Sequence, residues 1–207
     1  MPTATHITDY FGVFNLPRKL NLDPASLERD FYRLSRELHP DRFARASKAE
    51  QETALEKSSQ LNDAYRTLKD PITRTQYLLE LEGVKLEEQS AAATTAARTS
   101  GEEKKQVVPP ELLEEVFELN MQLQELKMGR DPETIENLNI ARIRFEAMLD
   151  VLLNELKSLW NHWDAVISQP THSEVTRIAI RDKMVALLNR RSYVRNLVRD
   201  VNGALTQ

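Results

Sequence analysis

Cysteine is absent from this chain of 207 residues, and there are only five glycines. Without cysteine the protein forms no disulfide and no thiolate metal site, and it has no cysteine nucleophile. The scarcity of glycine and of alternating β-branched residues argues against sheets. No apolar run reaches the length that spans a membrane. The net charge of −4 is too small to indicate nucleic-acid or membrane binding through bulk electrostatics.

Charged and apolar residues make up 29% and 41% of the chain, a balance that is typical of a helix-rich protein. We therefore predict an all-α fold. Residues 1–9 contain neither an apolar core nor an arginine, so they do not have the pattern of a signal or transit peptide. A cytoplasmic location is the expectation that remains.

The N-terminal part of the chain carries the pattern of a helical hairpin. Asp23 and Pro24 supply an N-cap side chain and a proline at the first helical position, which predicts a helix start. An apolar stripe follows: Leu27, Phe31, Leu34 and Leu38. A second stripe predicts another helix over about 48–69: Leu55, Leu61, Ala64, Tyr65 and Leu68. The two stripes are expected to bury each other in an antiparallel pair.

Short elements are expected on both sides of this hairpin. Residues 9–16 are aromatic and apolar, which predicts a short first element that packs on the rest. Asp70 and Pro71 end one helix and start the next, which stops at Gly83. The first unit is therefore expected over residues 8–83.

The tripeptide His39-Pro40-Asp41 lies at the bend of the predicted hairpin. It could be an ordinary helix stop, because proline disfavours helical geometry in the residue before it. Its imidazole and carboxylate could also act as a general acid and base. The sequence offers no oxyanion partner, metal-ligand spacing or phosphate-binding glycine loop to accompany them. We therefore predict a docking site and no enzyme activity.

Basic residues surround the tripeptide and make this region locally positive. They are Arg18, Lys19, Arg29, Arg33, Arg36, Arg42, Arg45 and Lys48. Such a cluster is often only a solvated helix face. Beside the tripeptide, it predicts a docking surface for an acidic partner, whose approach it would steer.

Residues 84–108 are expected to form a flexible linker. Their small and polar side chains cannot bury enough area to offset the entropy lost on ordering. The alanines in this stretch could instead extend a neighbouring helix.

Three helical patterns follow the linker and predict a three-helix bundle over residues 109–207. They cover about 111–128, Asp131 to about Ser168 with or without a break, and Thr171 to about Gly203. Thr171 and Glu174 have the spacing of a capping box at the start of the last helix.

The first bundle helix carries two apolar rows. One stripe is sufficient to pack the bundle: Leu112, Val116, Leu119, Leu123 and Leu126. Leu113, Phe117 and Met121 form a second row to one side of it, flanked by Glu114 and Glu118. The second row could be an exposed interaction patch. Alternatively, it could pack against the first unit or the third bundle helix.

With these residues in place, the chain resembles the J-proteins, and more narrowly the HscB family of co-chaperones for iron–sulfur cluster assembly. Residues 9–17 are similar to the family's opening, and His39-Pro40-Asp41-Arg42-Phe43 matches its signature loop. Residues 61–71, continued by 77–79, form the most family-specific stretch. The resemblance implies a J-domain followed by a scaffold-binding bundle.

The resemblance also implies two partners, no cofactor and no metal. The J-domain is expected to dock on a chaperone of the DnaK or HscA class and to stimulate its ATP hydrolysis, with Asp41 pairing with a chaperone arginine. The chaperone-binding residues are expected to be His39, Pro40, Asp41, Arg33, Arg36 and Arg42. The bundle is expected to bind an IscU-type iron–sulfur scaffold protein through Leu113, Glu114, Phe117 and Glu118. Tyr193 is a further candidate on the last helix.

Two other functions stay open at this point. The chain could be a J-protein with a different client, its bundle gripping unfolded chains. It could also be a purely structural helical adaptor in which the tripeptide occurs by chance.

Overall fold

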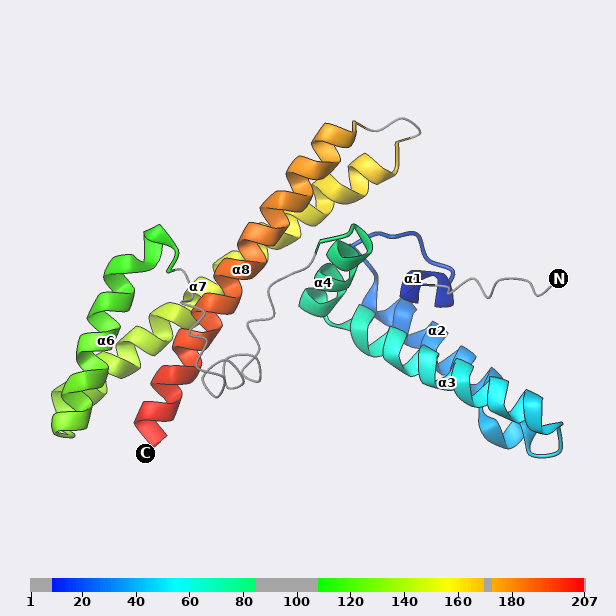
Figure 1. The fold of residues 1–207 in the computed structure, drawn as a ribbon, viewed down its shortest axis with the longest axis horizontal. Coiled ribbons are helices and arrows are strands. Elements are labelled where there is room, and N and C mark those ends of the chain that lie inside the picture. Colours follow the sequence, from blue (N-terminus) through cyan, green and yellow to red (C-terminus); the bar gives the residue numbers. More distant parts are fainter. Residues whose placement is uncertain (1–8, 85–107, 170–172, 207) are drawn as a thin grey trace. The chain divides into compact units, whose positions relative to one another are not determined.

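The computed structural model describes residues 9–84, 108–169 and 173–206, and all regular elements in these ranges are helices (Figure 1). The α-helices are α1 (Tyr10–Val13), α2 (Pro24–Glu37), α3 (Lys48–Lys69), α4 (Pro71–Leu81), α6 (Leu113–Met128), α7 (Pro132–Ile167) and α8 (Glu174–Thr206). Two 3-10 turns, η1 (Pro40–Phe43) and η2 (Pro110–Leu112), accompany them. The predicted all-α class is confirmed. Within the described ranges, no helix combines the length and apolar character that crossing a membrane requires.

The chain divides into two compact units. One consists of Met1–Lys85 and Trp160–Ile180, and the other of Leu86–Leu159 and Arg181–Gln207. The end of α7 and the start of α8 therefore belong with the N-terminal helices. The expected linker falls outside the described residues except at its two ends, Val84 and Val108.

The hairpin of α2 and α3 forms as the sequence predicts, with the two helices side by side and antiparallel (Figure 1). Asp23 starts α2 by accepting hydrogen bonds from the N–H groups of Ala25 and Ser26 at 3.1 and 3.2 Å. Between the helices, the rings of Phe31 and Tyr65 stack with their centroids 4.1 Å apart.

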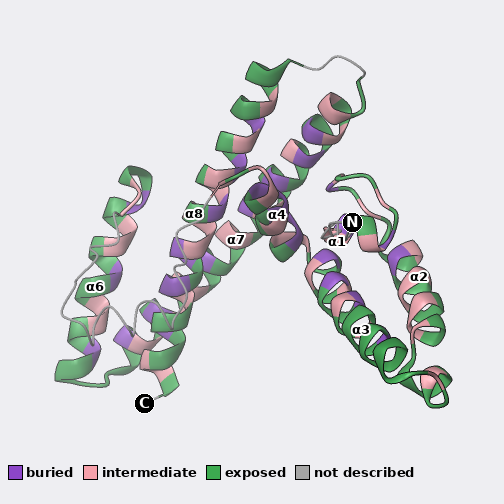
Figure 2. Ribbon diagram, turned by 45° about the vertical axis from the view of Figure 1, so that its right-hand side comes forward, coloured by how far each residue is buried: buried purple, intermediate pink, exposed green. Residues whose placement is uncertain are grey.

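The prediction is wrong for one member of the α3 stripe, Leu55, which was expected to be buried. Leu55 is 61% exposed, whereas its neighbour Ala54 is only 3% exposed. Ala54, Leu61 and Leu68 lie seven residues apart and share one helix face, so Leu55 is rotated about 100° away from that face. Figure 2 shows that α3 is largely exposed toward the end beside the hairpin bend.

Aromatic residues close the other end of the hairpin. Phe11 of α1 is fully buried, and Tyr10 stacks on Tyr77 of α4 with a centroid distance of 4.5 Å. The N–H of Tyr10 also donates to the hydroxyl of Tyr77 at 3.0 Å. Gly83 has a φ of 78°, a left-handed conformation that suits glycine and terminates α4 as predicted.

The end of α7 binds the loop between α1 and α2 within the first unit. The Asp164 carboxylate accepts hydrogen bonds from the N–H groups of Leu20 and Asn21 at 2.8 and 2.9 Å. The indole N–H of Trp163 donates to the carbonyl of Arg18 at 3.3 Å. These contacts join segments more than 140 residues apart in sequence.

A buried arginine adds to this attachment. Arg74 of α4 is 5% exposed, lies 5.4 Å from the ring of Trp160 and donates to the carbonyl of Leu68 at 2.7 Å. Burial lowers the pKa of Arg74 below its usual value, against the opposing influence of Asp70 and Asp164. The contact with an aromatic face compensates part of the desolvation of this cation.

The second unit is a three-helix bundle, but it excludes residues 160–180, which the predicted range of 109–207 included. Its buried core combines Leu119 and Leu126 of α6 with side chains of the two long helices, and Leu112 of η2 joins it. The other members are Leu138, Phe145, Leu152, Tyr193, Val194, Leu197 and Val201. Val116 and Leu123 pack against this core, so the predicted first stripe of α6 is confirmed.

The two long helices differ in detail from their predicted limits. α7 is continuous from Pro132 to Ile167, without a break. α8 begins at Glu174, where the Ser173 hydroxyl accepts from the N–H of Thr176 at 3.4 Å, and it continues to Thr206. Thr171 of the expected capping box lies outside the described residues.

Candidate functional site

The His39-Pro40-Asp41 tripeptide forms a defined turn at the bend of the hairpin. Proline starts the 3-10 turn η1, and the N–H of Asp41 donates to Nδ1 of His39 at 3.3 Å. A ring nitrogen that accepts this bond carries no proton, so the 3.5 Å approach of Nδ1 to Asp41 Oδ2 is not an ion pair in this arrangement. The ring proton then lies on Nε2, where a partner could accept it.

Both polar side chains of the turn are open to solvent. The His39 side chain is 55% exposed and the Asp41 side chain 91% exposed. Within the described part of the chain, the Asp41 carboxylate accepts no hydrogen bond. The turn therefore holds a histidine and a free carboxylate at the surface, as the docking prediction requires.

The predicted arginines surround this turn and are all exposed. Arg42 donates to the carbonyl of Arg36 at 3.5 Å, which ties the turn to the end of α2. Arg33 pairs with Asp30 and Glu37 at 3.1 and 3.3 Å, and these two hydrogen-bonded carboxylates raise the pKa of Arg33.

Four arginines on α2 and at the bend remain available to a partner. Arg29, Arg36, Arg42 and Arg45 make no ion pair with any residue that the structure describes. Arg18, which the sequence groups with them, is instead bound to Asp9 at 2.6 Å. The basic surface is therefore smaller than predicted and is concentrated around the hairpin bend.

The second row of α6 is exposed. Leu113, Phe117 and Met121 are 55%, 68% and 48% exposed, and Glu114 and Glu118 beside them are also exposed. Of the two interpretations left open by the sequence, the geometry is that of an exposed patch. It combines apolar side chains with carboxylates on one helix.

Tyr193 of α8 lies elsewhere. It is 7% exposed and belongs to the bundle core, and burial raises the pKa of its hydroxyl. Tyr193 is therefore not part of the exposed α6 patch, and its contact role stays a prediction.

Two exposed apolar side chains of the first unit were not predicted as surface residues. Leu55 of α3 and Tyr32 of α2 are 61% and 54% exposed. Tyr32 directly follows Phe31, a member of the predicted α2 stripe. The only sequence signal that Tyr32 points outward is that it lies one position round the helix from that stripe.

The DnaJ domain family matches residues 9–77 of this chain. Co-chaperone protein HscB homologs of two Vibrio cholerae serotype O1 strains are each 36% identical to it over 125 residues. That match covers 60% of this chain, and the chain spans 65% of the length of these curated relatives.

Solved structures extend the similarity along the chain. Chaperone HscB from Vibrio cholerae is 26% identical, with a TM-score of 0.60 over 94% of this chain and 95% of that one. The human co-chaperone protein HscB shares the fold, with a TM-score of 0.57 over 97% of this chain and 83% of that one, at 21% identity. In its DnaJ domain match, its relatives and its fold, the chain is similar to the J-proteins of the HscB type.

Proposed function

We propose that this protein is a co-chaperone that stimulates the ATPase of a DnaK- or HscA-class chaperone and delivers an IscU-type iron–sulfur scaffold protein to it. The exposed His39-Pro40-Asp41 turn within a basic surface is the observation that carries this proposal. The protein contributes no bond-making step of its own. It raises the local concentration of one partner beside the other, because its two binding sites share one chain.

The chaperone contact is centred on Asp41. Its carboxylate has no competing hydrogen bond among the described residues, and the proline-started turn holds it away from the helix surface. An exposed carboxylate of this kind can accept both N–H groups of a guanidinium fork. Arg33, Arg36 and Arg42 are proposed to orient an acidic surface of the chaperone around that contact.

The scaffold contact is the α6 patch, defined as Leu113, Glu114, Phe117 and Glu118. Phe117 is its most exposed apolar side chain and is proposed as the anchor, since aromatic residues dominate the binding energy of many interfaces. The two glutamates would select a partner with basic residues around an apolar pocket.

The deciding experiment measures steady-state ATP hydrolysis by a DnaK-class chaperone with and without this protein. Asp41→Asn keeps the shape of the side chain but removes its charge, so we expect stimulation to be lost while scaffold binding in a pull-down is retained. Phe117→Ala should do the reverse. Full stimulation by Asp41→Asn would refute the role of the turn.

The pull-down also tests the alternative client. If the wild-type protein stimulates the chaperone but does not bind the scaffold, the J-protein function stands and the scaffold assignment is wrong.

A further inference from the structure

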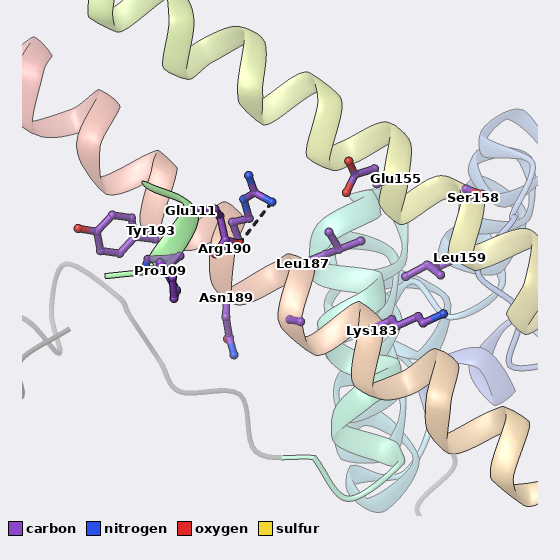
Figure 3. A pocket seen from close by; sticks show the side chains of 12 residues that line it. Pro109, Glu111, Glu155, Ser158, Leu159, Lys183, Leu187, Asn189, Arg190 and Tyr193 are labelled. Carbon is purple, nitrogen blue, oxygen red and sulfur yellow. Dashed lines mark ion pairs between the residues drawn. The ribbon is translucent and has the colours of Figure 1, made fainter. Parts of the chain in front are cut away.

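A groove of about 600 Å³ lies within the second unit (Figure 3). Its sides come from residues 155–159 of α7 and 183–193 of α8, while residues 109–111 lie at one end. The apolar part of the lining is formed by Pro109, Pro110, Leu159, Ala186, Leu187 and Tyr193. This volume is within the range of about 300–1,000 Å³ that is common for binding sites.

The groove is a continuation of the surface between α7 and α8 on which α6 packs. Along the core, Leu119 and Leu126 of α6 pack between the apolar faces of α7 and α8. The packing of this third helix continues into η2, where Leu112 is fully buried, and Val108 before it packs against the same core. Farther along, the same two helices continue, with Leu159 and Leu187 lining the groove, and no third helix among the described residues of the second unit covers them.

One ion pair on each flank fixes α6 and the η2 turn that precedes it between α7 and α8. On the α7 side, Glu115 pairs with Arg144 at 3.0 Å. On the α8 side, Glu111 pairs with Arg190 at 3.5 Å. The helix is therefore located by an apolar stripe and by one charged contact to each neighbour.

The uncovered stretch repeats this arrangement without the third helix. Glu155 on α7 and Lys183 on α8 both line the groove, and neither has an ion-pair partner in the part of the chain that the structure describes. The Nε–H of Arg190 is buried there and likewise has no acceptor. The charges on the two sides are opposite, so they specify an occupant with an acidic and a basic flank.

We propose that the groove binds an amphipathic helix of a partner protein, which occupies the third-helix position beyond Leu112. Its apolar face would lie on Leu159, Ala186 and Leu187. An acidic side chain would reach Lys183 and a basic one would reach Glu155. Apolar anchors at helical spacing with charged flanks are the chemistry by which helices recognise grooves. This site is separate from the turn and from the α6 patch.

The test uses a fluorescein-labelled peptide of three heptads, with leucines at the a and d positions, glutamates along one flank and lysines along the other. Its binding to the full chain is measured by fluorescence anisotropy. We expect saturable binding to the wild-type protein. Ala186→Trp should abolish binding because the indole fills the groove from an exposed position, and Ala147→Trp on the exposed face of α7 should not.

The charged flank is tested separately. Lys183→Glu should weaken binding of the same peptide about fivefold, and a peptide with lysines on both flanks should restore it. Circular dichroism melts of each variant check that the fold is intact. Three outcomes would each overturn the proposal: no saturable binding to the wild type, equal binding by Ala186→Trp, or equal binding of a peptide with the same composition in scrambled order.

Discussion

The hairpin bend and the α6 patch present their exposed residues by different physical means. At the bend, local polar contacts shape the backbone: Pro40 starts a turn, and the N–H of Asp41 binds His39. On α6, no side chain caps the helix start, and the orientation of the patch follows from the burial of Leu119 on the other side. One surface is positioned by hydrogen bonds close in sequence, and the other by packing against distant helices.

This difference implies different sensitivities to mutation. A surface positioned by local contacts should tolerate changes in the distant core but not in its caps. A surface positioned by packing should rotate or disorder when its buried stripe is weakened. The following experiments separate the two cases.

The largest expected loss in the free energy of unfolding comes from truncating a side chain of the α6 stripe. Leu119→Ala removes a 3% exposed side chain, and we expect it to lower the free energy of unfolding by about 2–5 kcal/mol. Phe117→Ala, two residues earlier and 68% exposed, should change it by no more than about 0.5 kcal/mol. Urea denaturation of the full chain measures both. A large loss in Phe117→Ala would place this ring in the core and contradict the proposed patch.

A smaller loss of stability is expected when the side-chain cap at the start of α3 is removed. The Ser47 hydroxyl accepts from the N–H of Glu50 at 3.4 Å, while the Glu50 carboxylate accepts from the N–H of Ser47 at 2.9 Å. Ser47→Ala should cost about 1 kcal/mol and increase hydrogen exchange in the first turn of α3. Ser59→Ala, at an exposed position inside the same helix, is the control and should not destabilise. Equal exchange in the two variants would mean that the cap does not stabilise the bend.

The cap of α1 makes stability depend on pH. Partial burial acts to raise the pKa of Asp9, but hydrogen bonds from the Gly12 N–H and the Arg18 side chain lower it below its ordinary value of 3.8 overall. A carboxyl with a lowered pKa in the folded state stabilises that state above pH 3.8, and this contribution is lost as the pH falls through the folded value.

Asp9→Asn should therefore remove one component of the acid destabilisation. Melting temperatures between about pH 5 and pH 2 test this, and the difference between wild type and variant should shrink as the pH falls. A constant difference across that range would contradict the assignment.

The smallest effect on stability is expected for the exposed arginines. Arg33→Ala breaks pairs with Asp30 and Glu37, and exposed pairs contribute little, so the melting temperature should hardly change. Chaperone stimulation should nevertheless weaken, most clearly at low salt, where charge steering is strongest. Arg66→Ala on α3 is the matched control. Equal stimulation by the two variants would remove Arg33 from the proposed contact.

Sequence patterns predicted the parts of this protein that depend on local order. The α2 stripe, the α3 limits and both rows of α6 follow from helical spacing and from caps such as Asp23, because these contacts join residues within one or two helical turns. The exposed turn also follows, since Pro40 ends α2 at a place where a helix pattern stops.

Tertiary packing determined the features of the structure that these sequence patterns did not predict. The attachment of Asp164 and Trp163 to the loop at Arg18 and Leu20 joins segments about 145 residues apart, and no local pattern encodes such a pairing. The same holds for Leu55, whose helix was predicted correctly while its exposure was not. Helical periodicity predicts which residues share a face. Which of these faces is buried depends on the helices that the folded chain packs against it.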